Sequence, residues 1–149
     1  MSGRQHFDAV VVGGGPAGAT AAADLATRGR SVLLVDRAAR ATSSGAIPPK
    51  AIEQFAIPDE LLVSRVTAAR MVSPSARRVD MPIEGGFVGM VDRAVFDEWL
   101  RCRAVAAGAE RRNGSFERLT RDADDIVVVH YRPTPDRSGR RRCRCGPAL

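Results

Sequence analysis

The stretch Ala9-Val-Val-Val-Gly-Gly-Gly-Pro-Ala-Gly-Ala19 decides the fold of this chain. Residues 6–12 end in an unbroken apolar run, which predicts a parallel strand buried on both faces. Three glycines follow at the spacing G-x-G-x-x-G, and an alanine-rich helix is predicted over residues 19–28 because alanine is the strongest helix former. Gly29 is expected to end that helix, and residues 31–35 to form a second apolar strand. The sequence therefore predicts a strand, a glycine turn, a helix and a strand, the βαβ unit.

Gly13, Gly15 and Gly18 match the fingerprint of a dinucleotide-binding turn. Gly13 permits the tight turn, Gly15 lets a pyrophosphate approach the backbone, and Gly18 lets the helix pack closely on the strand. Pro16 suits the first helical turn, where free N–H groups and the helix dipole favour a phosphate. A carboxylate, Asp36, ends the next strand, where it can accept hydrogen bonds from ribose hydroxyls. This context argues against the alternative, a tight turn without a ligand.

The fingerprint by itself does not separate FAD from NAD. An acidic residue at Asp36 disfavours a 2′-phosphate, so we do not expect NADP to bind at this turn. Arg37 either lies on the adenine or is an ordinary surface residue, and the sequence leaves both interpretations open.

The residues that follow predict a second set of elements. Strands are expected over residues 65–72, 77–83, 87–91 and 126–131, a short helix over 51–55, and a polar loop over 37–50. Asp92 is expected to cap a helix that begins at Arg93 and ends before Gly108. Its predicted core-facing side carries Phe96, Trp99, Leu100, Arg103 and Ala107.

The composition is that of an ordinary globular domain, except at the C-terminal end. Residues 132–149 hold six arginines and one aspartate, and so account for +5 of the net charge of +6. This segment has no apolar periodicity and cannot offset its ordering entropy, so we expect a disordered basic tail. Because the composition breaks abruptly, read-through of a wrong frame is the favoured interpretation. Without interleaved aromatic residues, nucleic-acid binding is not expected.

Three cysteines, Cys102, Cys143 and Cys145, are too few and too irregularly spaced for a disulfide framework or a metal site. We therefore expect no metal and a reducing compartment. The sequence shows no secretory signal and no apolar run long enough to cross a bilayer. A cytoplasmic location follows, with peripheral membrane contact left open.

Several segments beyond the glycine turn are more specific to one protein family than the turn itself is. They are Gly45-Ala-Ile-Pro48, Met71-Val-Ser-Pro-Ser75, Val79-Asp-Met81 and Gly89-Met-Val-Asp-Arg-Ala-Val-Phe-Asp-Glu-Trp-Leu100. Over residues 6–131 the chain thereby resembles the geranylgeranyl reductases of chlorophyll and bacteriochlorophyll synthesis. The resemblance implies an α/β fold, a Rossmann-like FAD-binding domain similar to that of p-hydroxybenzoate hydroxylase. It also implies that FAD takes hydride from NADPH and reduces a geranylgeranyl chain, carried on diphosphate or on a pigment, to phytyl.

The fingerprint and the resemblance together give the candidate cofactor-binding residues: Gly13, Gly15, Pro16, Ala17, Gly18, Asp36, Arg37, Gly45, Ala46 and Arg93. The residues from Gly13 to Arg37 are expected at the ADP moiety. Gly45 and Ala46 are expected beside the flavin, and Arg93 is expected near the FAD, at the head of a helix. No catalytic residue is assigned.

The chain departs from the family pattern in two ways. Ser43-Ser44 stands where the family commonly has Cys-Gly, and a serine hydroxyl is a weaker nucleophile than a thiol. The chain is also much shorter than family members and lacks their second FAD motif, Gly-Asp-Ala. We therefore interpret residues 1–131 as a partial FAD-binding domain. Two alternatives remain, a related FAD-dependent monooxygenase and a non-catalytic dinucleotide-binding fragment.

Overall fold

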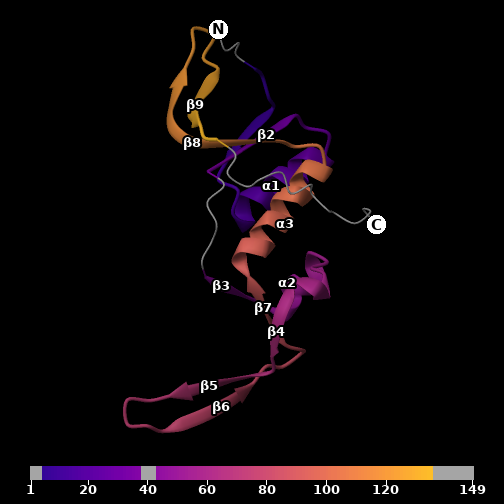
Figure 1. The fold of residues 1–149 in the computed structure, drawn as a ribbon, viewed down its shortest axis with the longest axis vertical. Helices are drawn as coiled ribbons and strands as arrows, with labels where there is room; N and C mark the ends of the chain where they lie inside the picture. Colours follow the sequence, from indigo (N-terminus) through magenta and orange to yellow (C-terminus); the bar gives the residue numbers. More distant parts are fainter. Residues whose placement is uncertain (1–4, 38–42, 136–149) are drawn as a thin grey trace. The chain divides into compact units, whose positions relative to one another are not determined.

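A computed structural model of the chain describes residues 5–37 and 43–135. The chain divides into two compact units, one formed by Met1–Arg40 with Asp97–Leu149 and the other by Ala41–Phe96. Helix α3 (Arg93–Ala106), labelled in Figure 1, contributes its first four residues to the second unit and the remainder to the first.

The first unit is built on a four-stranded sheet in the order β1-β2-β8-β9. Its strands are β1 (Ala9–Val12), β2 (Val32–Asp36), β8 (Glu110–Arg121) and β9 (Val127–Pro133). β1 and β8 both pair with β2 in parallel, whereas β8 and β9 form an antiparallel pair. Helix α1 (Pro16–Thr27) connects β1 to β2. The predicted βαβ unit is therefore present.

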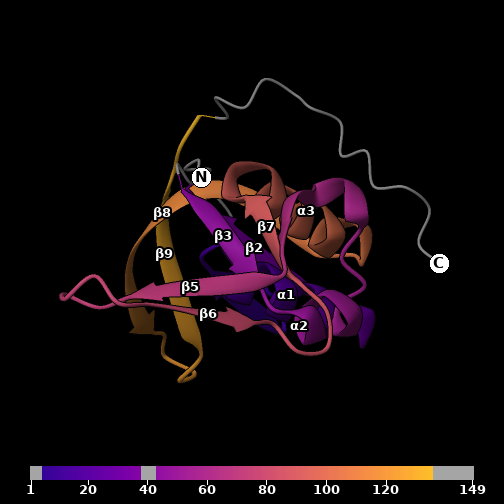
Figure 2. The same ribbon diagram turned by 90° about the horizontal axis from the view of Figure 1, so that it is seen from below.

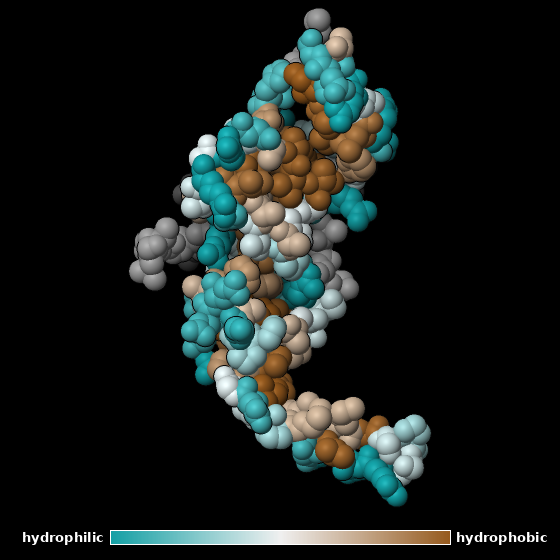
Figure 3. Space-filling model, turned by 180° about the vertical axis from the view of Figure 1, so that it is seen from behind, coloured by the Kyte–Doolittle hydropathy of each residue, from teal (hydrophilic) through white to brown (hydrophobic). Residues whose placement is uncertain are grey.

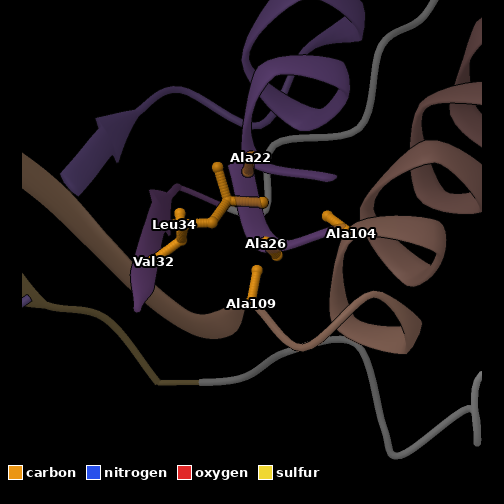
Figure 4. Close-up of a cluster of buried hydrophobic side chains, with 6 residues drawn as sticks. All are labelled: Ala22, Ala26, Val32, Leu34, Ala104 and Ala109. Carbon is orange, nitrogen blue, oxygen red and sulfur yellow. The ribbon is translucent and has the colours of Figure 1, made fainter. Parts of the chain in front are cut away.

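Small side chains make up the core of this unit (Figure 4). Leu34 and Val32 of β2 are almost fully buried, and they pack with alanines from α1, from α3 and from the turn after α3. The alanines of the cluster are Ala22, Ala26, Ala104 and Ala109. Because alanine has no side chain beyond Cβ, both helices can lie close against the sheet.

The opposite face of the same sheet is less well covered. Val11 packs on the core cluster, so alternation along the strand directs Val10 and Val12 to the other face. Val12 is 47% exposed, and β1 pairs with β2 alone among the described strands. Figure 3 shows hydrophobic side chains at the surface over this sheet. The prediction that β1 is buried on both faces is therefore wrong for the described chain.

The second unit holds a three-stranded antiparallel sheet in the order β3-β7-β4. Its strands are β3 (Ser44–Ile47), β7 (Val88–Asp92) and β4 (Leu62–Val66), and it also contains helix α2 (Pro49–Gln54) and a 3-10 turn, Asp59–Leu61. A hairpin of β5 (Ala68–Val72) and β6 (Arg78–Pro82) extends from it as a two-stranded arm (Figures 1 and 2). Every residue of the two arm strands is exposed.

Several predicted boundaries change for identifiable reasons. Helix α1 begins at Pro16 rather than at residue 19, because proline is tolerated in the first turn. The predicted loop over residues 37–50 contains β3, which lies against β7. The predicted strand over residues 65–72 is two strands that belong to different sheets, β4 and β5.

The predicted core-facing side of α3 is only partly correct. Phe96 and Leu100 are buried as predicted, whereas Arg103 is exposed. Asp97 and Arg101 are buried instead, at 6% and 5% exposure. The helical spacing of the apolar residues does not place Asp97 and Arg101 on the buried side, because charged side chains are rarely buried unless they are paired.

The end of the chain is described as far as residue 135. Arg132 and Pro133 belong to β9, so that strand runs two residues past its predicted end. The remainder of the predicted tail, residues 136–149, lies outside the described residues. Among the helices that are described, none has the length and hydrophobicity needed to cross a membrane.

Leu34 offers a direct test of the core. Replacing Leu34, which has no exposed surface, with alanine should lower the free energy of unfolding by about 2–5 kcal/mol, because it removes buried methyl groups and leaves a cavity. Leu119→Ala is the matched control, since Leu119 is 59% exposed and should change stability by less than about 0.5 kcal/mol. Urea denaturation followed by circular dichroism measures both values, and equal losses would contradict this description of the core.

Candidate dinucleotide site

The glycine turn links the end of β1 to the start of α1. Gly13 has a φ of +105°, a conformation that favours glycine, and its N–H donates to the carbonyl oxygen of Val35 at 2.8 Å. Gly15 is the extended N-cap of α1, and Pro16 occupies the first turn. The turn thus brings the chain from the sheet into a helix whose first N–H groups have no intrahelical acceptors.

Gly15 and Gly18 have opposite surroundings. A Cβ at Gly18 would stand 1.9 Å from the carbonyl oxygen of Gly13, so only glycine fits there without movement of the backbone. A Cβ at Gly15 would meet nothing within 4 Å. Gly18 is therefore needed for packing, whereas the open space at Gly15 is a cradle that a side chain would fill. Ala17, in the first turn of the helix, is exposed.

Asp36 lies directly against this turn. The N–H of Gly14 donates to Asp36 Oδ1 at 3.2 Å, which ties the end of β2 to the turn after β1. The carboxylate is 13% exposed, and its Oδ2 stands 3.4 Å from Nη1 of Arg101. Arg37, the next residue, is exposed at the surface. The structure therefore brings the fingerprint glycines and the predicted acidic residue together.

Arg101 of α3 is a part of this arrangement that the sequence analysis missed. Its Nη1 donates to the carbonyl oxygen of Gly14 at 3.0 Å, and its Nε donates to Glu98 at 2.9 Å. Glu98 in turn accepts two hydrogen bonds from Arg111, at 2.6 and 3.1 Å. The spacing of Glu98 and Arg101 is a detectable signal, but three-residue pairs of this kind are common on exposed helix surfaces.

The charge of Glu98 is set by two opposing effects. Burial by itself raises the pKa of Glu98, but the hydrogen bonds and charges of Arg111 and Arg101 outweigh it and hold the pKa below its ordinary value. Glu98 therefore stays ionised, and it holds both guanidinium groups in place.

The remaining predicted residues form a second group, inside the other unit. Gly45 and Ala46 lie in β3, opposite Val91 and Met90 of β7. A Cβ at Gly45 would come within 2.6 Å of Cδ of Arg93, so the arginine side chain lies over this glycine. As predicted, Asp92 caps the helix, accepting a hydrogen bond from the N–H of Ala94 at 2.8 Å.

Comparison with known proteins identifies the family. Residues 7–127 match the profile of the pyridine nucleotide-disulphide oxidoreductases. The chain belongs to this family. The match covers the glycine turn, Asp36 and the second group of predicted residues.

Curated relatives of the chain are prenyl reductases. It is 60% identical over 124 residues to geranylgeranyl diphosphate reductase of Rhodobacter capsulatus, covering 83% of this chain and 32% of the relative. It is 40% identical over 140 residues to the chloroplastic enzyme of Oryza sativa subsp. japonica, covering 87% and 29%. Digeranylgeranylglycerophospholipid reductase 2 of Methanopyrus kandleri is 36% identical over 133 residues, covering 85% and 33%. The chain spans about a third of the length of these relatives, and the predicted resemblance is confirmed.

Solved structures share the fold. A geranylgeranyl bacteriochlorophyll reductase-like protein from Thermoplasma acidophilum superposes with a TM-score of 0.74 at 21% identity, over 85% of this chain and 37% of that one. The flavin-dependent brominase Bmp2 gives a TM-score of 0.72 at 21% identity, over 88% and 35%. The predicted α/β fold of an FAD-binding domain is confirmed by the family match and by these structural likenesses.

The Glu98 network predicts a pH dependence of stability. Because the pKa of folded Glu98 is lowered, its contribution is fully present above the ordinary value of 4.5 and is lost as the pH falls from there through the lowered pKa. Glu98→Gln should therefore give a lower free energy of unfolding that depends less steeply on pH below 4.5.

Urea denaturation over a series of acidic pH values measures this slope. Glu60→Gln removes one exposed carboxylate from the other unit and controls for the change in net charge. If the free energy of unfolding of the Glu98→Gln variant depends on pH as steeply as that of the unchanged protein, Glu98 is not the source of the acid sensitivity of its stability.

Proposed function

We propose that the chain holds the ADP half of FAD in an oxidoreductase that reduces a geranylgeranyl chain. The observation that supports this most is the open cradle at Gly15, with the carboxylate of Asp36 tied to the adjacent residue. A bare backbone beside a helix N-terminus suits a diphosphate, and a neighbouring carboxylate suits the hydroxyls of a ribose.

Each candidate residue has a role in this proposal. The first N–H groups of α1, at Ala17 and Gly18, lie where the helix dipole favours negative charge, and Pro16, which has no N–H, fits the first turn. Gly13 makes the turn and Gly15 leaves room for the pyrophosphate, while Asp36 accepts from the ribose. These residues fit the ADP group because Gly18 lets the helix pack closely against the turn, and because Gly15 has no side chain to fill the open space beside it.

The second group is assigned to the flavin part of the cofactor. We infer that Gly45 and Ala46 lie beside the flavin and that Arg93 contributes a positive charge near FAD. The packing of Arg93 over Gly45 supports a shared role, since it fixes the start of the arginine side chain. Arg37 is exposed at the end of β2, a position that suits contact with the adenine.

The reaction is proposed from the relatives. FAD, when bound, supplies hydride transfer. We propose NADPH as the hydride donor and a prenyl chain, on diphosphate or on a pigment, as the substrate that is reduced to phytyl. Relatives named as reductases of geranylgeranyl diphosphate and of digeranylgeranylglycerophospholipid support a prenyl substrate. A cytoplasmic location with peripheral membrane contact suits such a lipid-like substrate.

Two other functions fit less well. The monooxygenase alternative rests on the shared fold alone. A halogenase role draws only on structural likeness at 20–23% identity, which reflects the fold, whereas the reductases are up to 60% identical. A dinucleotide-binding fragment without any catalytic role in the cell would share the site described above. Flavin binding alone does not separate that alternative from the reductase, whereas turnover by this chain would exclude it.

Gly15 provides the test of the cradle. We expect Gly15→Val to lower the affinity for FAD by about a hundredfold or more, because the branched side chain would fill the space required by the pyrophosphate. Ala21→Val is the control, since Ala21 is exposed on the same helix. Isothermal titration with FAD measures both affinities. Unchanged affinity in the Gly15 variant would remove the case for this turn as the binding site.

A separate experiment tests whether this chain alone catalyses the reduction. We expect the purified chain to bind FAD but to form no saturated product from NADPH and geranylgeranyl diphosphate, because its relatives are about three times as long. The product is measured by extraction and mass spectrometry, with the full-length reductase of Rhodobacter capsulatus as the positive control. Saturated product from this chain would contradict the expectation and establish turnover directly.

A further inference from the structure

Arg101 contacts both parts of the proposed ADP site with one side chain. The side chain is 7% exposed, and its Nη1 lies 3.0 Å from the carbonyl oxygen of Gly14 and 3.4 Å from Oδ2 of Asp36. Gly14 donates to the other oxygen of the same carboxylate at 3.2 Å. The guanidinium, the carboxylate and the Gly14 backbone therefore close a small ring of polar contacts.

The contact with the Gly14 carbonyl fixes the direction of the next N–H group. The carbonyl of Gly14 and the N–H of Gly15 belong to one peptide unit, which is planar, and in the trans form they point in opposite directions. Because Arg101 binds the carbonyl, the N–H of Gly15 is directed away from Arg101. Glycine-rich backbone would otherwise be free to rotate this peptide.

We propose that Arg101 is a positioning residue that orients the Gly14–Gly15 peptide toward the pyrophosphate and holds Asp36 in place for the ribose. This inference rests on the proposed function, since it assigns Arg101 to the same ADP site. Arg101 does not touch the cofactor in this proposal, and it acts through the backbone of Gly14 and the carboxylate of Asp36.

The support behind Arg101 is rigid. Its Nε is held by Glu98 at 2.9 Å, and Glu98 is held by two hydrogen bonds from Arg111 of β8. A Cβ on Gly14 would stand 2.9 Å from Cδ of Arg101, so the stem of the arginine lies directly against the turn. A buried guanidinium is stable only when it is paired in this way.

The same network balances charge beneath the site. Asp36 and Glu98 carry two negative charges, and Arg101 and Arg111 carry two positive charges. An isolated carboxylate at Asp36 would repel a diphosphate bound a few ångströms away. Pairing with Arg101 lowers this repulsion, and the carboxylate oxygens can still accept hydrogen bonds from the ribose.

The test compares Arg101→Lys with Arg103→Lys in the whole chain. Lysine keeps the positive charge and most of the stem, but its single ammonium group cannot reproduce the planar fork that serves Gly14, Asp36 and Glu98 together. Arg103 lies two residues further along α3 and is exposed, so the same substitution there is a matched control. Circular dichroism confirms that each variant is folded at the temperature of the titration.

The probes are ADP, which carries both ribose and pyrophosphate, and adenosine, which carries the ribose alone. We expect Arg101→Lys to weaken ADP binding about tenfold or more, with a smaller loss for adenosine, and Arg103→Lys to change neither. Equal losses for the two ligands, or an Arg101 variant that behaves like the Arg103 variant, would overturn the positioning role. Failure of the unchanged protein to bind ADP would instead overturn the proposed function on which the inference rests.

Discussion

The hydrogen bond between the N–H of Gly14 and the carboxylate of Asp36 is the constraint that organises the site. It joins the turn after β1 to the end of β2, two points that the parallel register of the strands already places side by side. The N–H of Gly13, which donates to the carbonyl oxygen of Val35, extends the same pairing by one residue. A diphosphate site and a ribose site can therefore be adjacent without any long-range element between them.

The glycine fingerprint predicted this part of the fold because each glycine answers a local requirement. Gly18 is needed against the carbonyl of Gly13, and Gly13 is needed for its positive φ, so both follow from backbone geometry alone. Strand β8 escaped prediction because its sequence, Glu110–Arg121, is highly polar. Only its first four residues pair with β2, and the rest pairs with β9, so no apolar alternation marks it as a strand.

Arg101, the site residue that the sequence analysis missed, escaped prediction for a different reason. Arg101 is buried because its charge is paired on several sides, and sequence alone cannot show the partners of a charged side chain. Glu98 is near in sequence, but Gly14 and Asp36 are 87 and 65 residues away and become neighbours only in the folded unit. The family resemblance suggested Gly45 and Arg93 separately as cofactor-binding residues, and the structure adds that the two residues pack closely against each other.

The arrangement separates two tasks that a flavoenzyme performs together. The residues assigned to ADP lie between Gly13 and Arg37, and with Arg101 they belong to one unit whose core is formed by α1, β2 and α3. In the proposed site, ADP is recognised by the ends of two short parallel strands and the N-terminus of α1, with α3 as the supporting helix. The residues assigned to the flavin belong to the other unit, on β3 and at the start of α3. None of the described residues assigned above belongs to both groups, so substitutions in the first unit should change the affinity for ADP without altering the residues assigned to the flavin.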